Sequence, residues 1–501
     1  MFLIYKKRGM YLSIDLFSLR KIRRGAIAEL DRDVTQNEYK ALIPVSESAR
    51  RNFEEFARSV LEHRNEYTGL RWKEDPALFS LCTVNEDNIH SFYAFATPEV
   101  KELYRREFVR NGKGMTFSRF LTELGIRSHR RNVEFLRSLG CMLPVTAVNA
   151  NLYDASFGEI QTLREKNDYV DNHSYHDHGK YQQDTQRWSI DNRSAITAEA
   201  AVPRDVMPSR IWGKPFLVTE FDFCSPNHFR SEAGAIFGGY AALQGWDGVF
   251  RFCLSYRPDQ EIRHFGLAGD PINMLSEKIG LLNFLRGDVR PAEKKFALRF
   301  DSSTEIPEDF SRLGLYAQIG SLGRSAPLPA GVEEVPQNWA AEPKQLMLSP
   351  ESGCFRQVTD LSECLISPEG GNLIGAKTSV RFIDGRSTFY IASMDGQRLE
   401  KSRRLLLLLL TDVQNSQTVF ADQHHNLMLS GGRLPLLVRA GSAEVTLQRS
   451  DDASLKLYAV ALDGSRLAEL PVVRQGNDLR FTLKTVYALR KEPALAFELS
   501  E

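Results

Sequence analysis

Two glutamates follow short apolar stretches of the chain, at positions where a carboxylate could take part in a reaction. Glu220 closes the stretch Lys214-Pro-Phe-Leu-Val-Thr-Glu220, and Glu86 follows an apolar segment at 77–84. Apolar runs of this length are typical of strands that are buried on both faces. On either stretch alone, an acidic residue that turns out to solvent explains the pattern equally well. The recurrence of the pattern favours a functional pair.

Two carboxylates at the ends of two strands are suited to the hydrolysis of glycosidic bonds. One carboxyl group donates a proton to the leaving oxygen, and the other attacks the anomeric carbon or activates water. Neither task requires a metal or a cofactor, and we expect none here. About three strand–helix units separate Glu86 from Glu220, which would place the two on opposite sides of a barrel mouth.

Predicted strands and helices alternate over residues 1–300. The predicted strands lie at 10–17, 77–84, 142–149, 169–172, 215–219 and 248–254. The predicted helices lie at 47–63, 98–108, 116–138 with a break around Gly125, 156–165, 231–243 and 273–286, with long polar loops at 21–45 and 173–208. This alternation predicts an α/β fold with a parallel sheet, and polar residues at strand ends are typical of a (β/α)₈ TIM-type barrel.

The barrel predicted for residues 1–300 has six strand–helix units instead of eight, and the deficit lies at its start. Residues 2–8 and Gly9 read as the end of a helix and its cap, directly before the first strand. We therefore expect a barrel that lacks its first two strands, as if earlier elements belonged to a longer protein.

The pattern changes after residue 300. Several prolines mark a loop-rich linker at 301–344, and short alternating runs with Asp-Gly and Gly-Gly turns fill 345–501. This second pattern predicts an all-β domain, most simply a β-sandwich. The six leucines at 405–410 are too few to span a membrane and are predicted as a buried strand.

Three motifs in order along the chain resemble a known clan. Asn85-Glu86, His173-Ser-Tyr175 and Thr219-Glu220 each follow a predicted strand. Their order is similar to that of the retaining glycoside hydrolases with (β/α)₈ barrels, which include cellulases, mannanases and β-galactosidases. The resemblance covers about residues 1–300, and the ordered set is more specific than any one motif.

This resemblance implies a role for each matching residue. Glu86 would be the acid/base and Glu220 the nucleophile of a double displacement on β-linked sugars. Asn85 would hydrogen-bond the hydroxyl next to the anomeric centre. Tyr175 would contact the nucleophile and help to keep it ionised, and His173 matches a histidine that often precedes that tyrosine.

The sequence also departs from the clan's pattern. The arginine that usually supports the nucleophile lies on strand two, which is not found here. Strand eight usually presents a tryptophan as a sugar platform, whereas this chain has Leu254-Ser-Tyr256, so Tyr256 is the candidate platform. Trp188 lies in the polar loop at 173–208 and is a second residue of the type that stacks on sugars.

Two other interpretations stay open at this point. His173, His176, Asp177 and His178 could bind zinc or iron if their loop folded back, which would make the protein a metal-dependent hydrolase. A barrel without two strands could instead be an inactive or carbohydrate-binding remnant, because its open edges expose backbone groups. A partner chain or a homo-oligomer could fill such a gap.

Composition limits the partners. Lys plus Arg and Asp plus Glu number 64 each among 501 residues, and this balance argues against a nucleic-acid partner. No apolar run is long enough for a membrane span, so we expect no membrane insertion and an oligo- or polysaccharide as the partner. The six cysteines show no zinc-type spacing. The first residues lack the order of a signal peptide, and the sequence does not predict a compartment.

Overall fold

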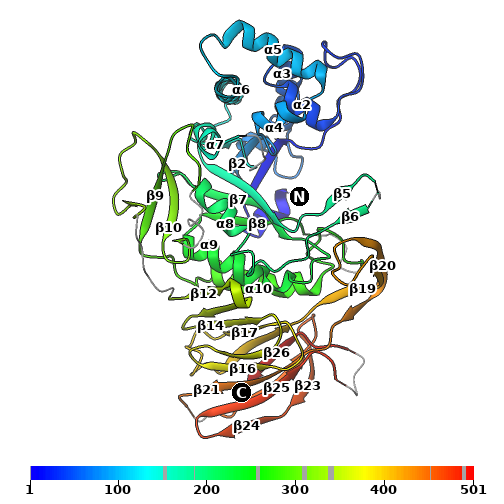
Figure 1. Ribbon diagram of the computed structural model, residues 1–501, viewed down its shortest axis with the longest axis vertical. Helices are drawn as coiled ribbons and strands as arrows, with labels where there is room; N and C mark the ends of the chain where they lie inside the picture. Colours follow the sequence, from blue (N-terminus) through cyan, green and yellow to red (C-terminus); the bar gives the residue numbers. More distant parts are fainter. Residues whose placement is uncertain are drawn as a thin grey trace.

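The computed structural model describes residues 2–150, 155–184, 187–254, 260–306, 313–336, 344–451, 453–487 and 492–501. Helices gather at the amino-terminal end, mixed strands and helices occupy the middle, and strands fill the carboxyl-terminal end (Figure 1). No helix in these ranges is both long enough and apolar enough to cross a membrane.

The first 254 residues contain six parallel strands, which form two sheets. β1 (Leu12–Phe17), β2 (Leu78–Val84) and β3 (Val145–Thr146) form one sheet, and β4 (Val170–His176), β7 (Phe216–Phe223) and β8 (Gly248–Arg251) form another. A parallel bridge between Ala150 and His173 joins the two sheets. The strands therefore follow one another in chain order, and their carboxyl ends lie on the same side.

The predicted α/β arrangement is present, but the strands do not close into a barrel. β1 and β8 are the terminal strands of their sheets, and neither has a second partner strand among the described residues. The carboxyl ends of β2, β4 and β7 nevertheless converge as they would in a barrel, and these three strands position the candidate site.

Helices lie near each predicted position, but those at 36–42, 89–95 and 203–206 were not predicted. The helix predicted at 231–243 is a 3₁₀ turn (Arg230–Glu232), a π-helix (Gly234–Gly238) and a short α-helix (Gly239–Gln244). The helices are α1 (Phe2–Lys7), α2 (Gln36–Leu42), α3 (Glu47–Leu61), α4 (Ile89–Phe95), α5 (Pro98–Asn111), α6 (Phe117–Ser138), α7 (Phe157–Arg164), α8 (Pro203–Val206), α9 (Gly239–Gln244) and α10 (Pro271–Phe284). α2 lies in the predicted polar loop, where Thr35 and Glu38 form a capping box. α6 continues unbroken through Gly125. A Cβ at Gly125 would lie 2.9 Å from Leu163 Cδ2, so the glycine allows α7 to pack closely against α6.

The predicted loop at 173–208 contains regular structure. β4 extends through His173 and Tyr175 to His176, and β5 (Lys180–Gln182) pairs with β6 (Arg187–Ser189) as a hairpin. The sequence of these strands is rich in polar residues and was therefore predicted as a loop. Their side chains face other polar site residues or solvent.

The segment predicted as a linker, 301–344, contributes to a small parallel sheet. β9 (Lys295–Phe300) lies between β10 (Gln318–Gly323) and β11 (Glu333–Glu334). A bridge from Ile211 to Ser321 joins this sheet to the loop before β7. The two short strands β10 and β11 were not predicted, because the many prolines of this segment are typical of a loop.

Two antiparallel sheets fill residues 345–501. The larger contains β12 (Leu346–Ser349), β13 (Cys354–Val358), β14 (Ser362–Ser367), β17 (Ser387–Ser393), β18 (Arg404–Leu410), β26 (Ala496–Ser500), β22 (Lys456–Val460) and β23 (Arg466–Leu470). The smaller contains β15 (Gly371–Ile374), β16 (Thr378–Phe382), β21 (Ser442–Gln448), β25 (Asp478–Lys484) and β24 (Val472–Gln475). Apolar residues of both sheets form one core cluster.

The run of leucines explains how the two regions meet. In β18, Leu405, Leu407 and Leu409 belong to the core between the sheets. Leu408 and Leu410 belong instead to the core that also contains residues of α9 and α10. A strand with both faces buried reads as a continuous apolar run. A separate hairpin, β19 (Val413–Phe420) with β20 (Met428–Val438), reaches from this region toward β6.

Candidate active site

The structure brings Glu86, His173 and Glu220 together at the carboxyl ends of β2, β4 and β7. One carboxylate oxygen of each glutamate and one ring nitrogen of His173 all lie within 4.8 Å of one another. His173 Nδ1 is 3.7 Å from Glu86 Oε1 and 3.5 Å from Glu220 Oε2. The imidazole thus lies between two carboxylates that are far apart in the sequence.

The backbone of Glu86 has an uncommon conformation that hydrogen bonds from neighbouring residues stabilise. Its φ of +54° lies in the left-handed region, which is uncommon for a residue with a side chain. The Glu86 N–H donates to Asn149 Oδ1 at 2.6 Å, and the Asn85 N–H donates to the carbonyl of Phe17 at 2.8 Å. Strained backbone of this kind is common at functional sites, where neighbouring contacts hold it.

A β-bulge positions Glu220. Val218 pairs with Asn172, but the next pair in the register is Glu220 with His173, so Thr219 is an extra residue in β7. The N–H of Thr219 donates to Asp171 Oδ1 at 3.1 Å and its hydroxyl donates to Asp171 Oδ2 at 2.6 Å. A bulge turns the following side chain, and here it directs the carboxylate of Glu220 toward His173.

His173 is buried, and its surroundings raise its pKa. Its Nε2 is 3.1 Å from Asn149 Nδ2 and 2.9 Å from the Thr219 hydroxyl. Burial is the largest influence and lowers the pKa of His173, but contact with Glu86 and the charges of Asp171 and Glu220 together raise it. Because two acceptors flank Nδ1, a proton on that nitrogen stabilises both carboxylates.

The environments of the two glutamates differ. Burial raises the pKa of Glu220, opposed by His173 and by a hydrogen bond that the Tyr175 hydroxyl donates to Glu220 Oε2. The pKa of Glu86 is lowered, first by its contact with His173, although burial acts in the opposite direction. The side chain of Glu220 is 17% exposed and that of Glu86 is 40% exposed.

The other predicted site residues are distributed around this centre. Asn85 is buried, and its Oδ1 has no hydrogen-bond partner among the described residues. Trp188 is half exposed on β6 and its ring stacks with that of His264 at 6.1 Å. Tyr256 lies outside the described residues.

The structure does not gather the histidines proposed as metal ligands. His176 Nε2 lies 2.8 Å from the carbonyl of Arg193, and Asp177 accepts backbone N–H groups of Asp191 and Asn192 at 2.6 and 2.7 Å. Within the described ranges, the group with ligand atoms close enough to share an ion is Glu86, His173 and Glu220. Of the four predicted ligands, that group contains His173 alone.

Sequence reasoning missed three residues that support the site. Asn149 binds both the Glu86 backbone and the His173 ring, whereas Asp171 and Thr219 bind each other beside that ring. Burial, the largest influence, raises the pKa of Asp171. The available signal was a polar residue at or within a predicted buried strand, as Asn149 and Asp171 both are.

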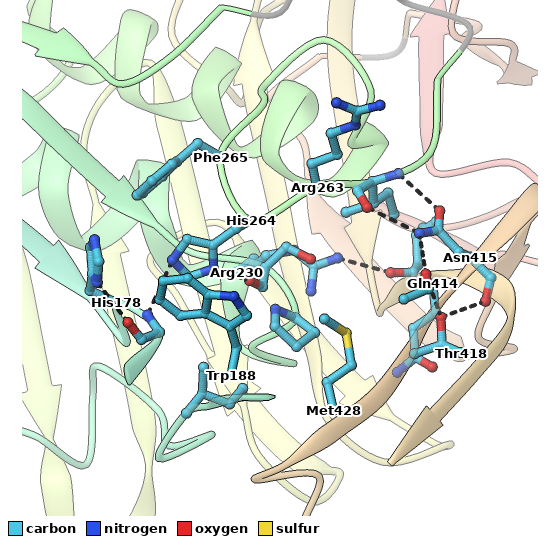
Figure 2. A pocket seen from close by; sticks show the side chains of 17 residues that line it. His178, Trp188, Arg230, Arg263, His264, Phe265, Gln414, Asn415, Thr418 and Met428 are labelled. Atoms are coloured by element: carbon cyan, nitrogen blue, oxygen red, sulfur yellow. Dashed lines mark hydrogen bonds between the residues drawn. The ribbon is translucent and has the colours of Figure 1, made fainter. Parts of the chain in front are cut away.

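A cavity of about 340 Å³ lies beside the site, between the loops after β4 and β7 and the β19–β20 hairpin. Figure 2 shows Trp188, His264 and Met428 around it. Neither glutamate lines this cavity. Phe265, which does, is 5.4 Å from the ring of Tyr175, so one aromatic layer separates the cavity from Glu220.

Comparisons with known proteins give weak similarities. No protein-family model matches the chain, and no curated protein matches it. An endo-1,4-β-D-mannanase from Thermotoga petrophila RKU-1 is 14% identical over 56% of this chain and 78% of its own, with a TM-score of 0.36. Another structure of an endo-β-1,4-mannanase from Thermotoga petrophila is 12% identical over 96% of this chain and 80% of its own, with a TM-score of 0.38.

A third solved structure is the GH39 enzyme from Xanthomonas axonopodis pv. citri. It is 11% identical over 90% of this chain and 72% of its own, with a TM-score of 0.31. Scores this low do not establish a common fold. The function proposed below therefore depends on the geometry of the site and on the motifs in the sequence.

Proposed function

We propose that this protein is a retaining glycoside hydrolase that acts on β-linked oligo- or polysaccharides. The observation that carries the proposal is the approach of the Glu86 and Glu220 carboxylates to within 4.8 Å. Retaining enzymes hold their two carboxyl groups about 5–5.5 Å apart, whereas inverting enzymes need about 6.5–9.5 Å to admit a water molecule. The β-linkage follows from the motif resemblance.

Glu220 is the nucleophile in this proposal and Glu86 is the acid/base. The charge of His173 and the hydrogen bond from the Tyr175 hydroxyl both act to lower the pKa of Glu220, which favours its carboxylate form. Glu86 is the more exposed of the two and lies where a leaving group can depart into solvent. The motif resemblance assigns the sugar hydroxyl to Asn85, whose buried Oδ1 has no hydrogen-bond partner among the described residues.

In the free protein, the pKa shifts of the two glutamates run opposite to the shifts that these roles require. In this proposal, substrate binding changes them in the required direction. The pKa is raised for Glu220 and lowered for Glu86. A bound sugar displaces more water from Glu86, because that side chain is 40% exposed against 17% for Glu220. Loss of water raises the pKa of a carboxyl group, so binding of a sugar should raise the pKa of Glu86 more than that of Glu220.

Conservative substitutions test the pair. Glu86→Gln and Glu220→Gln should each lower kcat/KM on a 4-nitrophenyl β-glycoside by about 10³-fold or more, because each removes an essential carboxyl group. The matched control is Glu66→Gln, an exposed glutamate, which should match the wild type. Activity that survives both site substitutions would refute the proposal, as would loss of activity on addition of EDTA alone.

Azide separates the two roles. In Glu86→Ala the glycosyl-enzyme can still form from a substrate with a good leaving group, and azide should restore turnover with a β-glycosyl azide as product. In Glu220→Ala azide takes the place of the nucleophile and should give the α-glycosyl azide. The reverse pattern would exchange the two roles.

A further inference from the structure

A second cavity, of about 610 Å³, lies where the loop after β7 meets the β19–β20 hairpin and the turn before β17. It is lined by Asn192, His228, Phe229, Arg386, Asp412, Gln414, Gln423, His425, Leu437, Val438 and Arg439. Its volume falls in the range of small-molecule sites. Gln414 also lines the cavity beside Trp188, so the two cavities are neighbours.

Arg386 lines the cavity, and no described residue hydrogen-bonds or ion-pairs with its guanidinium. The guanidinium carbon lies 4.1 Å from the centre of the Phe229 ring. Its buried Nε has no hydrogen-bond partner, and the described residues form no ion pair with it. Stacking on a ring fixes the plane of the guanidinium and leaves its donor edge available to a planar oxyanion.

Arg439 adds a second cation with similar character. Its Nη1 donates to the carbonyl of Asp384 at 3.3 Å and its Nη2 donates to the carbonyl of Arg386, while its Nε has no described partner. Burial lowers the pKa of both Arg386 and Arg439. Two incompletely paired guanidinium groups therefore lie on the wall of one cavity.

Nearby carboxylates are already engaged by other donors. Asp412 lines the cavity, but its Oδ1 accepts the Val413 N–H at 2.8 Å and its Oδ2 contacts His228. Glu232 is fully buried behind the cavity and accepts the Ser194 hydroxyl at 2.8 Å, and burial raises its pKa to about 7. The lining thus has two arginines for one carboxylate.

We propose that this cavity binds a sugar carboxylate, as in a uronic acid. Arg386 would bind the carboxylate in the plane of its guanidinium. The Gln423 amide can both donate to and accept from sugar hydroxyls, and the Gln414 oxygen can accept. The Asn192 amide is already bound to the His424 carbonyl and the His228 N–H. The Gln414 NH₂ lies beside His228. The cavity is too large for a lone ion. This proposal concerns binding only and does not depend on the reaction at Glu86 and Glu220.

Titration calorimetry with D-glucuronate tests the proposal, with D-glucose and inorganic sulfate as the comparison probes. The wild type should bind glucuronate and not glucose. Arg386→Ala should weaken glucuronate binding at least tenfold. Arg386→Lys keeps the charge but not the planar fork, so it should also bind more weakly than the wild type. The matched control is Arg381→Ala, which removes an exposed arginine paired with Glu444 in the same region and should leave binding unchanged.

Equal affinity for glucuronate in the wild type and in both Arg386 variants would overturn the proposal, as would no binding by the wild type. Circular dichroism establishes that each variant is folded, and Arg386→Lys keeps the test informative if Arg386→Ala does not fold. Sulfate that binds as tightly as glucuronate would assign the cavity to a free anion and overturn the sugar assignment.

Discussion

Among the described residues, His173 is the titratable cation that lies closest to both candidate carboxylates. Its Nδ1 lies between two glutamates, and its Nε2 lies beside Asn149 and Thr219. The glycoside hydrolases that the sequence motifs resemble usually support the nucleophile with an arginine. In the described part of this chain, the ion-pair partner of Glu220 is His173. A titratable cation in this place makes activity sensitive to pH.

Tyr175→Phe should move the acidic limb of the kcat/KM profile. The Tyr175 hydroxyl lowers the pKa of Glu220, which burial raises above its ordinary value of 4.5. In the proposed mechanism Glu220 must be ionised to attack, so activity should fall as the pH drops through this pKa. Loss of the hydrogen bond raises the pKa further, and the limb should move up by about one pH unit. Tyr181→Phe, on the exposed hairpin, is the control, and an unmoved limb would contradict the assignment.

The sequence drew attention to four residues near predicted strand ends. Glu86 follows β2, whereas His173 and Tyr175 lie within β4 and Glu220 lies within β7. The structure places their side chains close together, and their roles stay predictions. The supporting contacts of Asn149 and Thr219 were not predicted. Their contacts cross between strands, and a single sequence contains no direct record of which strands are neighbours.

At the scale of elements, the bulge in β7 connects the strand to the chemistry. Thr219 is the extra residue, and both its N–H and its hydroxyl bind the buried Asp171. A period-two pattern cannot reveal such an insertion, because one extra residue moves every following side chain to the other face.

Thr219→Val should weaken both stability and catalysis. Valine keeps the shape but removes the donor to Asp171, which leaves a buried carboxylate oxygen without that bond and costs about 1–3 kcal/mol of unfolding free energy. Because His173 and Glu220 are then less well positioned, kcat should fall more than KM rises. Urea unfolding and steady-state kinetics measure the two effects. Thr162→Val, which removes a hydroxyl on α7, should leave kcat unchanged.

Element types were easier to predict than element ends. The helix predicted at 47–63 is α3, Glu47–Leu61, and its apolar spacing was clear. β4 was predicted to stop at Asn172 and continues to His176, because its last residues are polar site residues and not core residues. The hydrophobic pattern therefore does not predict the carboxyl-terminal part of β4, which contains the candidate site residues.

At the scale of the whole molecule, the carboxyl-terminal region is packed firmly against the α/β region. Arg230 is buried and binds Asp270 at 2.6 Å on one side and the carbonyl of Val413 at 2.8 Å on the other. Asn415 binds both the N–H and the carbonyl of Ile262. The β19–β20 hairpin is therefore held beside the candidate site, where it lines both cavities.

Arg230→Ala should destabilise the whole chain. It leaves Asp270 buried without its cation, a change that costs about 3–5 kcal/mol. Arg381→Ala, in an exposed pair with Glu444, should cost about 1 kcal/mol or less. Differential scanning calorimetry measures both variants. Equal effects would show that buried Arg230, which also binds the Val413 carbonyl, does not stabilise the contact between the two regions.

The domain order was predictable, but the packing between regions was not. Turn residues and short alternating runs indicated the strands of 345–501. The leucines of β18 indicated a buried strand, and only the structure shows that its two faces enter different cores. The barrel expected for 1–300 is represented by six parallel strands without closure among the described residues.

The stereochemistry of hydrolysis tests the central claim most directly. Proton NMR during the first minutes of hydrolysis of a 4-nitrophenyl β-glycoside identifies which anomer of the sugar is released before mutarotation. Carboxylates within 4.8 Å predict a double displacement, so the β-anomer should appear first. If the α-anomer appears first, or if the wild type hydrolyses no β-glycoside, the account given for Glu86 and Glu220 is wrong.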